Sequence, residues 1–181
     1  MGAGARLRGR HVQRLARRGI LTDDWQARVA AVWSSTGDHT DDEVIAQIDA
    51  LVAERAADDP AALFEAASAR DYVGRESEAE PLYKQALSAG LEPPLRGQAV
   101  IQLASTLRNL GRYDEAVSWL QDEFADAPGH PLADAGKAFM ALVLSSKGDD
   151  TAALAMALEA LSHHLPQYGN AVRGYAVDLL R

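Results

Sequence analysis

The stretch LRNLGRYDEAVSWL, residues 107–120, decides the fold that this sequence predicts. Its apolar residues recur three and four positions apart on both sides of Gly111, which is the pattern of two amphipathic helices joined by a short turn. Glycine suits such a turn because it takes a positive φ that other residues resist. Gly74 and Gly148 lie 37 residues before and after Gly111. We therefore expect an array of helical hairpins with a 37-residue period.

Small residues repeat in step with these three glycines. Two helices approach closely only where small side chains face each other, while larger residues fill the remaining gaps. We therefore expect one small position in each helix of a hairpin to mark the contact between the two. These positions hold Ala67, Ala104 and Ala141 in the first helices, and Ala79, Ala116 and Ala153 in the second helices.

The stretch 107–120 resembles the tetratricopeptide repeat through Gly111, Tyr113 and Ala116, and Pro128 after it closes the repeat unit. Residues 60–93, 97–130 and 134–165 all resemble this repeat, whose usual length is about 34 residues. The segments RDYVGRESEAEPLYKQAL (70–87) and VIQLASTLRNLG (100–111) are similar to a compact family of uncharacterised bacterial tetratricopeptide proteins. The resemblance implies an all-α superhelix of antiparallel helix hairpins. It also implies protein interaction, with dimerisation as an option, and no known activity.

The chain divides into three expected parts. Residues 1–21 form a basic arm, since residues 1–19 contain six arginines and no acidic residue. Residues 22–58 read as a divergent N-terminal helical hairpin, whose second helix starts with the capping box Thr40–Glu43. Residues 59–181 hold the three repeats and a capping helix over residues 167–181. The alternative for residues 22–58 is a degenerate fourth repeat, because Gly37 lies 37 residues before Gly74.

Composition excludes several classes of function. The 181 residues contain no cysteine, which rules out disulfides and thiolate chemistry and fits a cytoplasmic location. The net charge is −8, and its excess of acid outside the arm argues against nucleic acid as the main ligand. His163 and His164 are adjacent and point about 100° apart on a helix, so they suit solvent better than a shared metal. We expect no enzyme activity, no metal and no cofactor.

The resemblance also implies a ligand groove, because the first helix of each repeat in this family lines a concave surface. Side chains that combine amide, hydroxyl, charged and apolar groups suit an extended or helical peptide, whose backbone needs donors and acceptors. Carried over by register, the groove residues are Phe64, Ser68, Asp71 and Tyr72 in the first repeat, Gln98, Ile101, Gln102, Ser105, Arg108 and Asn109 in the second, and Ala138, Phe139, Leu142 and Ser145 in the third.

One known ligand class of the family does not fit this chain. Chaperone-binding members hold the terminal carboxylate of a peptide with lysines and asparagines at set groove positions. The matching positions here hold Phe64, Ser68, Gln102, Ala135 and Phe139. The resemblance therefore does not extend to a chaperone tail as ligand.

Arg70 stands where the family has a large apolar or aromatic residue. A buried guanidinium needs an acidic partner or a path to solvent, because leaving it unpaired costs several kcal/mol. Asp71, Glu78 or the carboxylate of a ligand are the candidate partners. We favour a pair within the chain.

These observations predict a protein–protein interaction module, an adaptor or scaffold that binds a peptide or protein segment in the concave groove. Two alternatives stay open. The arginine-rich arm could bind nucleic acid or an anionic membrane surface. The chain could instead be a self-associating structural unit, a homodimer joined through apolar C-terminal residues such as Val177 and Leu180.

Overall fold

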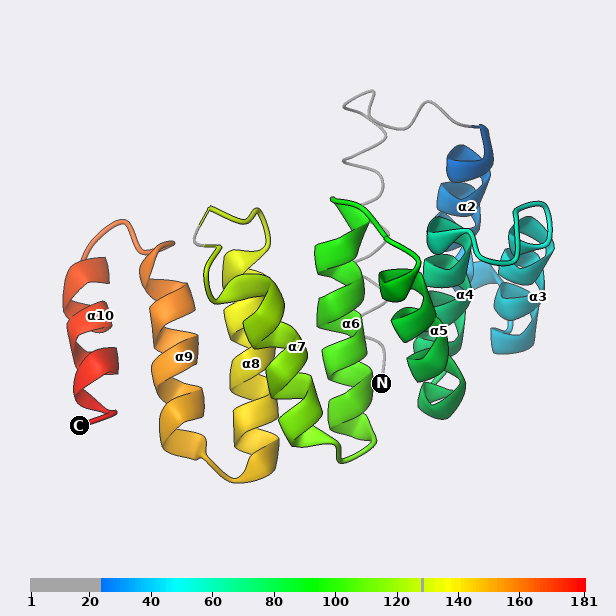
Figure 1. The fold of residues 1–181 in the computed structure, drawn as a ribbon. Coiled ribbons are helices and arrows are strands. Elements are labelled where there is room, and N and C mark those ends of the chain that lie inside the picture. Colours follow the sequence, from blue (N-terminus) through cyan, green and yellow to red (C-terminus); the bar gives the residue numbers. More distant parts are fainter. Residues whose placement is uncertain (1–23, 128) are drawn as a thin grey trace. The chain divides into compact units, whose positions relative to one another are not determined.

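The computed structural model describes residues 24–127 and 129–181, and within these ranges it contains helices and no strand (Figure 1). The predicted all-α class is confirmed. The basic arm lies outside the described residues. The elements are α2 (Asp24–Ser34), η1 (Thr36–Asp38), α3 (Asp41–Val52), α4 (Pro60–Tyr72), α5 (Glu76–Ser88), α6 (Leu95–Asn109), α7 (Tyr113–Phe124), α8 (Ala133–Lys147), α9 (Asp150–Ser162) and α10 (Gly169–Asp178).

The chain forms two compact units, Met1–Leu91 and Glu92–Arg181. The first unit contains the N-terminal hairpin of α2 and α3 together with the first repeat, α4 and α5. The second unit contains the second repeat (α6 and α7), the third repeat (α8 and α9) and α10. None of the described helices is long and apolar enough to span a bilayer.

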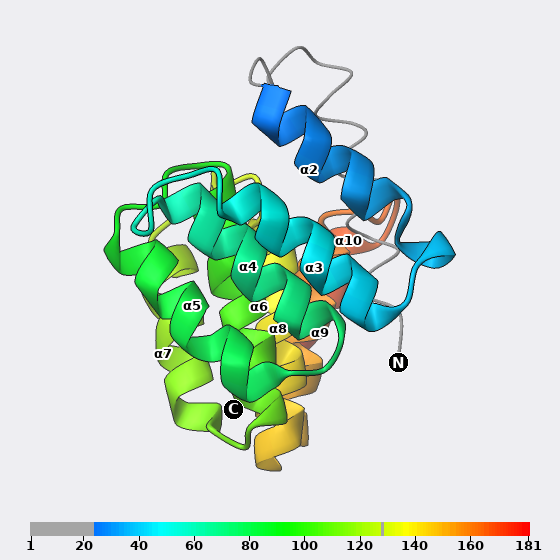
Figure 2. The same ribbon diagram turned by 90° about the vertical axis from the view of Figure 1, so that its right-hand side faces the viewer.

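In the first unit, the N-terminal hairpin packs on the first repeat through two tryptophans. Figure 2 shows α3, α4 and α5 side by side. Trp25 and Trp33 of α2 are buried in the apolar core, and each also donates a hydrogen bond from its indole N–H. Trp25 donates to the Leu51 carbonyl at 2.7 Å, and Trp33 donates to the Glu65 carboxylate at 2.6 Å. The second bond ties α2 to α4.

Local sequence explains where the helices of this unit begin. Thr40 and Glu43 form the predicted capping box, in which each side chain accepts a hydrogen bond from the other residue's backbone N–H. The Asp59 carboxylate accepts the Ala62 N–H at 3.0 Å, and Pro60 occupies the first turn of α4, where its missing N–H costs nothing.

The three glycines of the 37-residue period end α4, α6 and α8 in the same way. Gly74, Gly111 and Gly148 have φ of 77°, 74° and 94°. At Gly111, the glycine N–H donates to the Arg108 carbonyl and the next N–H, of Arg112, donates to the Leu107 carbonyl. Matching pairs of bonds follow Gly74 and Gly148. This is a Schellman motif, and it reverses the chain at one fixed position in every repeat.

Burial agrees with the expected small-residue contacts. All six alanines predicted to mark the contact between paired helices are buried. Within the second unit, α8 packs against α6, α7 and α9, and α10 packs against α9. Gly136 lets α8 approach α7, because a Cβ at this position would lie 2.7 Å from the Phe124 ring.

We expect Gly111→Ala to destabilise the protein by about 1–2 kcal/mol, because an L-residue resists the left-handed conformation. No atom lies within 4 Å of the added Cβ, so the cost is conformational rather than steric. Urea unfolding followed by circular dichroism measures it. Gly174→Ala in α10 is the matched control, since it also has no atom within 4 Å and gains helix propensity. Equal effects of the two substitutions would contradict this account.

Candidate functional site

The four first-repeat residues expected in the groove make contacts inside the first unit. Phe64 and Ser68 are each only 2% exposed, so a ligand has no access to them in this structure. Phe64 packs on Tyr83 with ring centroids 6.2 Å apart, and the Ser68 hydroxyl donates to the Phe64 carbonyl. Asp71 accepts a 3.4 Å hydrogen bond from the Tyr83 hydroxyl. Phe64 and Asp71 therefore contribute side-chain contacts between α4 and α5.

Tyr72, the fourth of these residues, packs against the N-terminal hairpin. Its ring meets Trp33 edge-on, with centroids 5.9 Å apart, and it borders the hydrophobic core of the first unit. The burial of α4 has a simple cause, since α4 lies between α3 and α5. The hairpin contacts Tyr72, whereas Phe64 and Asp71 contact Tyr83 of α5.

The second-repeat residues form a half-exposed stripe along α6. Gln98, Gln102, Ser105 and Arg108 recur at helical spacing on this helix, and we call this set the polar face of α6. Ile101, from the same predicted set, is buried. The remaining residue, Asn109, is exposed at the end of α6 and accepts a 3.1 Å hydrogen bond from Arg108.

Arg108 carries a buried polar atom of this face that no hydrogen bond satisfies within the described residues. Its Nη2 donates to Asn109, whereas its Nε is buried and makes no hydrogen bond within the described part of the chain. A buried donor without an acceptor costs about 1–3 kcal/mol. An incoming carboxylate or carbonyl oxygen would remove that cost.

The third-repeat residues lead to a separate feature, an open apolar groove between α8 and α9. The α8–α9 groove has a volume of about 660 Å³. It includes the predicted Ala138, Leu142 and Ser145, but not Phe139, which is half-buried elsewhere on α8. Its lining residues are Asp134, Ala135, Ala138, Ala141, Leu142 and Ser145 of α8, and Asp150, Ala153, Leu154, Ala157, Ala160, Leu161 and His164 of α9 and the turn after it.

Half of this groove was missed because the family pattern assigns ligands to the first helix of each repeat alone. The α9 side contributes Leu154, Ala157 and Leu161, which recur at i, i+3 and i+7. Leu154 and Leu161 are each about half exposed. That spacing of apolar residues is visible in the sequence. Their exposure is not, because an amphipathic stripe normally packs on a neighbouring helix.

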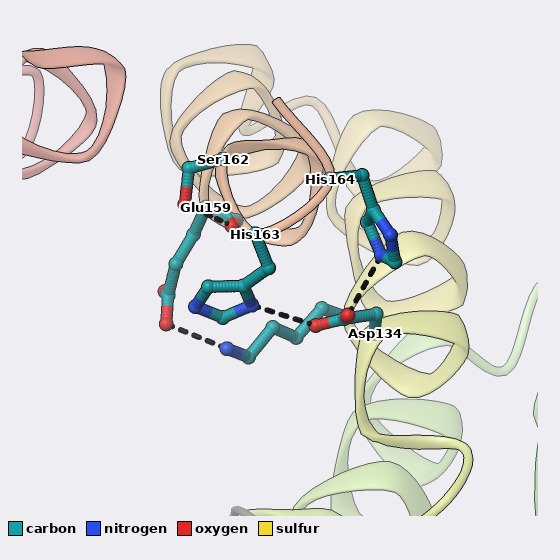
Figure 3. A network of polar contacts seen from close by, with 6 residues as sticks. Asp134, Glu159, Ser162, His163 and His164 are labelled. Carbon is teal, nitrogen blue, oxygen red and sulfur yellow. Dashed lines mark hydrogen bonds and ion pairs between the residues drawn. The ribbon is translucent and has the colours of Figure 1, made fainter. Parts of the chain in front are cut away.

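Polar contacts close both ends of the α8–α9 groove. At one end, Asp134 of α8 bonds both histidines that follow α9, with 3.0 Å between its Oδ1 and His163 Nδ1 and 2.8 Å between its Oδ2 and His164 Nε2 (Figure 3). At the other end, the Ser145 hydroxyl donates to Asp150 at 2.8 Å. These contacts hold α8 beside α9.

The adjacent histidines therefore reach the two oxygens of one carboxylate rather than a common metal. Their hydrogen bonds lower the pKa of Asp134, with His163 the larger contributor and His164 the smaller. Among residues 24–127 and 129–181, no group of three histidine or acidic side chains is placed to hold a metal ion.

Arg70 pairs within the chain, but neither Asp71 nor Glu78 is its partner. Its guanidinium donates two hydrogen bonds to Asp49 of α3, at 2.6 and 2.9 Å, and a third to the Ala66 carbonyl at 3.2 Å. The bond to Asp49 is the main cause that raises the pKa of Arg70, and the charge of the predicted Glu78, which does not bond the guanidinium, raises it further. Arg70 thus connects the first repeat to the N-terminal hairpin, and the family's apolar contact is replaced by an ion pair.

A family model described as "Tetratrico peptide repeat" matches residues 60–179. The chain belongs to the tetratricopeptide repeat family. The match starts at the first residue of α4 and extends through α10, so it covers all three repeats. No curated protein and no solved structure is significantly similar to the chain. Tetratricopeptide repeats generally act as protein-interaction modules, and membership of the family supports this general role for the protein.

For this tetratricopeptide repeat protein, we expect Arg70→Met to destabilise the first unit by about 1 kcal/mol, since Asp49 is partly exposed and solvent weakens the pair. Asp49→Ala should cost a similar amount. Because each substitution breaks the same contact, the double variant should cost less than their sum, by about 0.5–1 kcal/mol. Urea unfolding of the four proteins measures this coupling. Additive effects would contradict the pairing, and lost partner binding at unchanged stability would assign Arg70 to a ligand.

The lowered pKa of Asp134 predicts a pH-dependent contribution to stability. A carboxyl group whose pKa falls on folding stabilises the fold above its unfolded-state value, and this contribution disappears as the pH drops through the folded value. Asp134→Asn should therefore lower the melting temperature at about pH 6, and the difference from wild type should begin to shrink below about pH 4 and disappear only when the pH falls below the lowered pKa of Asp134. Thermal unfolding across this range is the measurement. Asp122→Asn on α7 is the control, and an identical pH profile for both variants would refute the assignment.

Proposed function

We propose that this protein is an adaptor or scaffold that binds an extended or helical segment of a partner protein along the polar face of α6. The observation that carries the proposal is the buried Nε of Arg108, which has no acceptor within the described chain. Arginine favours carboxylate and carbonyl oxygens because it presents several donors in a rigid plane. A partner's acidic side chain or backbone carbonyl supplies the missing acceptor.

The rest of the polar face supports the same role. Gln98, Gln102 and Ser105 offer amide and hydroxyl groups that can donate to and accept from a peptide backbone. These side chains project from a helix whose other side is firmly packed, since Leu103 and Leu107 are completely buried. A rigid helix holds its binding groups in position before the partner arrives, which lowers the entropy cost of binding.

The test is capture of partners from an extract of the native cells, followed by quantitative mass spectrometry with the full chain as bait. We expect Arg108→Ala to lose at least one protein that the wild type retains, while its melting temperature stays unchanged or rises. Arg112→Ala is the matched control, because Arg112 is exposed at the start of α7 and pairs with Glu115. It should retain the same protein.

Calorimetry with the captured protein then measures affinity directly, and we expect Arg108→Ala to weaken binding about 10-fold or more. If no captured protein distinguishes Arg108→Ala from Arg112→Ala, the polar face of α6 is not the binding surface and the proposal fails.

A further inference from the structure

The α8–α9 groove corresponds, one repeat later, to the surface between α6 and α7 that α8 covers. In the preceding hairpin, α8 packs on both α6 and α7, where Ile101 and Leu120 are buried and Gly136 lies against Phe124. The residues 37 positions after Ile101, Leu120 and Phe124 are Ala138, Ala157 and Leu161. All three line the α8–α9 groove. The groove is therefore built as a site for one more helix.

The chain's own last helix does not lie in this groove. α8, α9 and α10 follow one another side by side, and α10 packs against α9 (Figure 1). The start of α10 is held there, because Gly169 approaches the Ser162 carbonyl so closely that a Cβ would collide with it. Ser162 does not line the groove. Holding α10 at this position leaves the groove open.

α10 itself exposes the apolar residues that such a groove binds. Ala176 is its buried residue, and Val172, Tyr175 and Leu179 lie beside it at i, i+3 and i+7. Tyr175 is 69% exposed and Leu179 is 39% exposed. The α8 side of the groove extends from Asp134 to Ser145, about 16 Å along a helix, and α10 with its flanking residues 168–179 has the same span.

Charge and area agree with this match. The two ends of the groove carry Asp134 and Asp150, while α10 carries Arg173; Arg181 after the helix pairs with Asp178 of α10 at 2.8 Å. Three adjacent helices about 20 Å long and about 10 Å apart present roughly 600 Å² per copy. Two copies face to face would bury about 1,200 Å² in total, which reaches the lower end of the range for specific interfaces.

From these observations we propose that two copies of this chain associate through α8, α9 and α10, with α10 of each copy lying in the α8–α9 groove of the other. The contact is isologous, so it closes as a dimer and leaves no open end for further growth. It uses no residue of the polar face of α6 and does not depend on the function proposed there.

Light scattering after size-exclusion chromatography of the full chain tests the dimer at about 10–100 μM, a range in which weak specific dimers are detectable. We expect twice the monomer mass for the wild type. Ala157→Glu in the groove and Tyr175→Glu on α10 should each raise the dissociation constant of the dimer at least 10-fold. Both positions are exposed, so neither change disturbs the core. Leu110→Glu, another exposed apolar position in the second unit, is the matched control and should remain dimeric.

A mixture of the two variants tests the reciprocal contact. Ala157→Glu retains a wild-type α10, and Tyr175→Glu retains a wild-type groove, so the mixture restores one of the two contacts. We expect more dimer in the mixture than in either variant alone. A monomeric wild type, a dimer unaffected by either substitution, or a dimer that only one of them weakens would each overturn the proposal.

Engineered cysteines test the same contact without disturbing it, because the chain contains no cysteine of its own. Ala157→Cys mixed with Tyr175→Cys should give a mixed disulfide dimer under mild oxidation. Ser146→Cys, at an exposed position on α8 outside the groove lining, is the control partner for Tyr175→Cys. Equal yields from the two pairs would contradict the placement of α10 in the groove.

Discussion

The close approach of paired helices at alanine is the constraint on which each hairpin depends. Ala104 and Ala116 are fully buried in the second repeat, and a larger side chain at either position would push α6 and α7 apart. The left-handed glycine between them sets the register of this contact, because the chain reverses at one defined residue. Gly111 therefore determines which side chains of α6 point toward α7 and which remain on its polar face.

In the first unit, polar groups help to attach the N-terminal hairpin to a repeat that is packed mainly by apolar contacts. The N-terminal hairpin adds a tryptophan core to α4, and two partly buried acidic groups then accept bonds across the junction. Glu65 accepts from Trp33, and Asp49 accepts from Arg70. Both contacts are charge-assisted hydrogen bonds, which have stricter geometry than apolar packing. They orient the hairpin on α4, where the Trp33 ring also meets Tyr72.

The second unit ends differently from a regular array. A terminal repeat usually carries a helix that covers its last apolar surface. Here α10 is held beside α9 through Gly169, and the α8–α9 groove stays open between its polar ends, Asp134 with its two histidines and Ser145 with Asp150. An open groove and an exposed apolar helix in one unit provide complementary surfaces. Association of two copies would bury both without a further repeat in the chain.

The sequence by itself determined the helical class, the three repeats and the burial of the six repeating alanines, because these follow from short-range periodicity and from glycine's access to positive φ. It also indicated that Arg70 pairs within the chain. Only the tertiary structure decided that the partner is Asp49, that Phe64 is buried, and that Leu154 and Leu161 are exposed beside α8. Each of these depends on which helix lies against which face. That arrangement joins residues far apart in the sequence, where local periodicity carries no information.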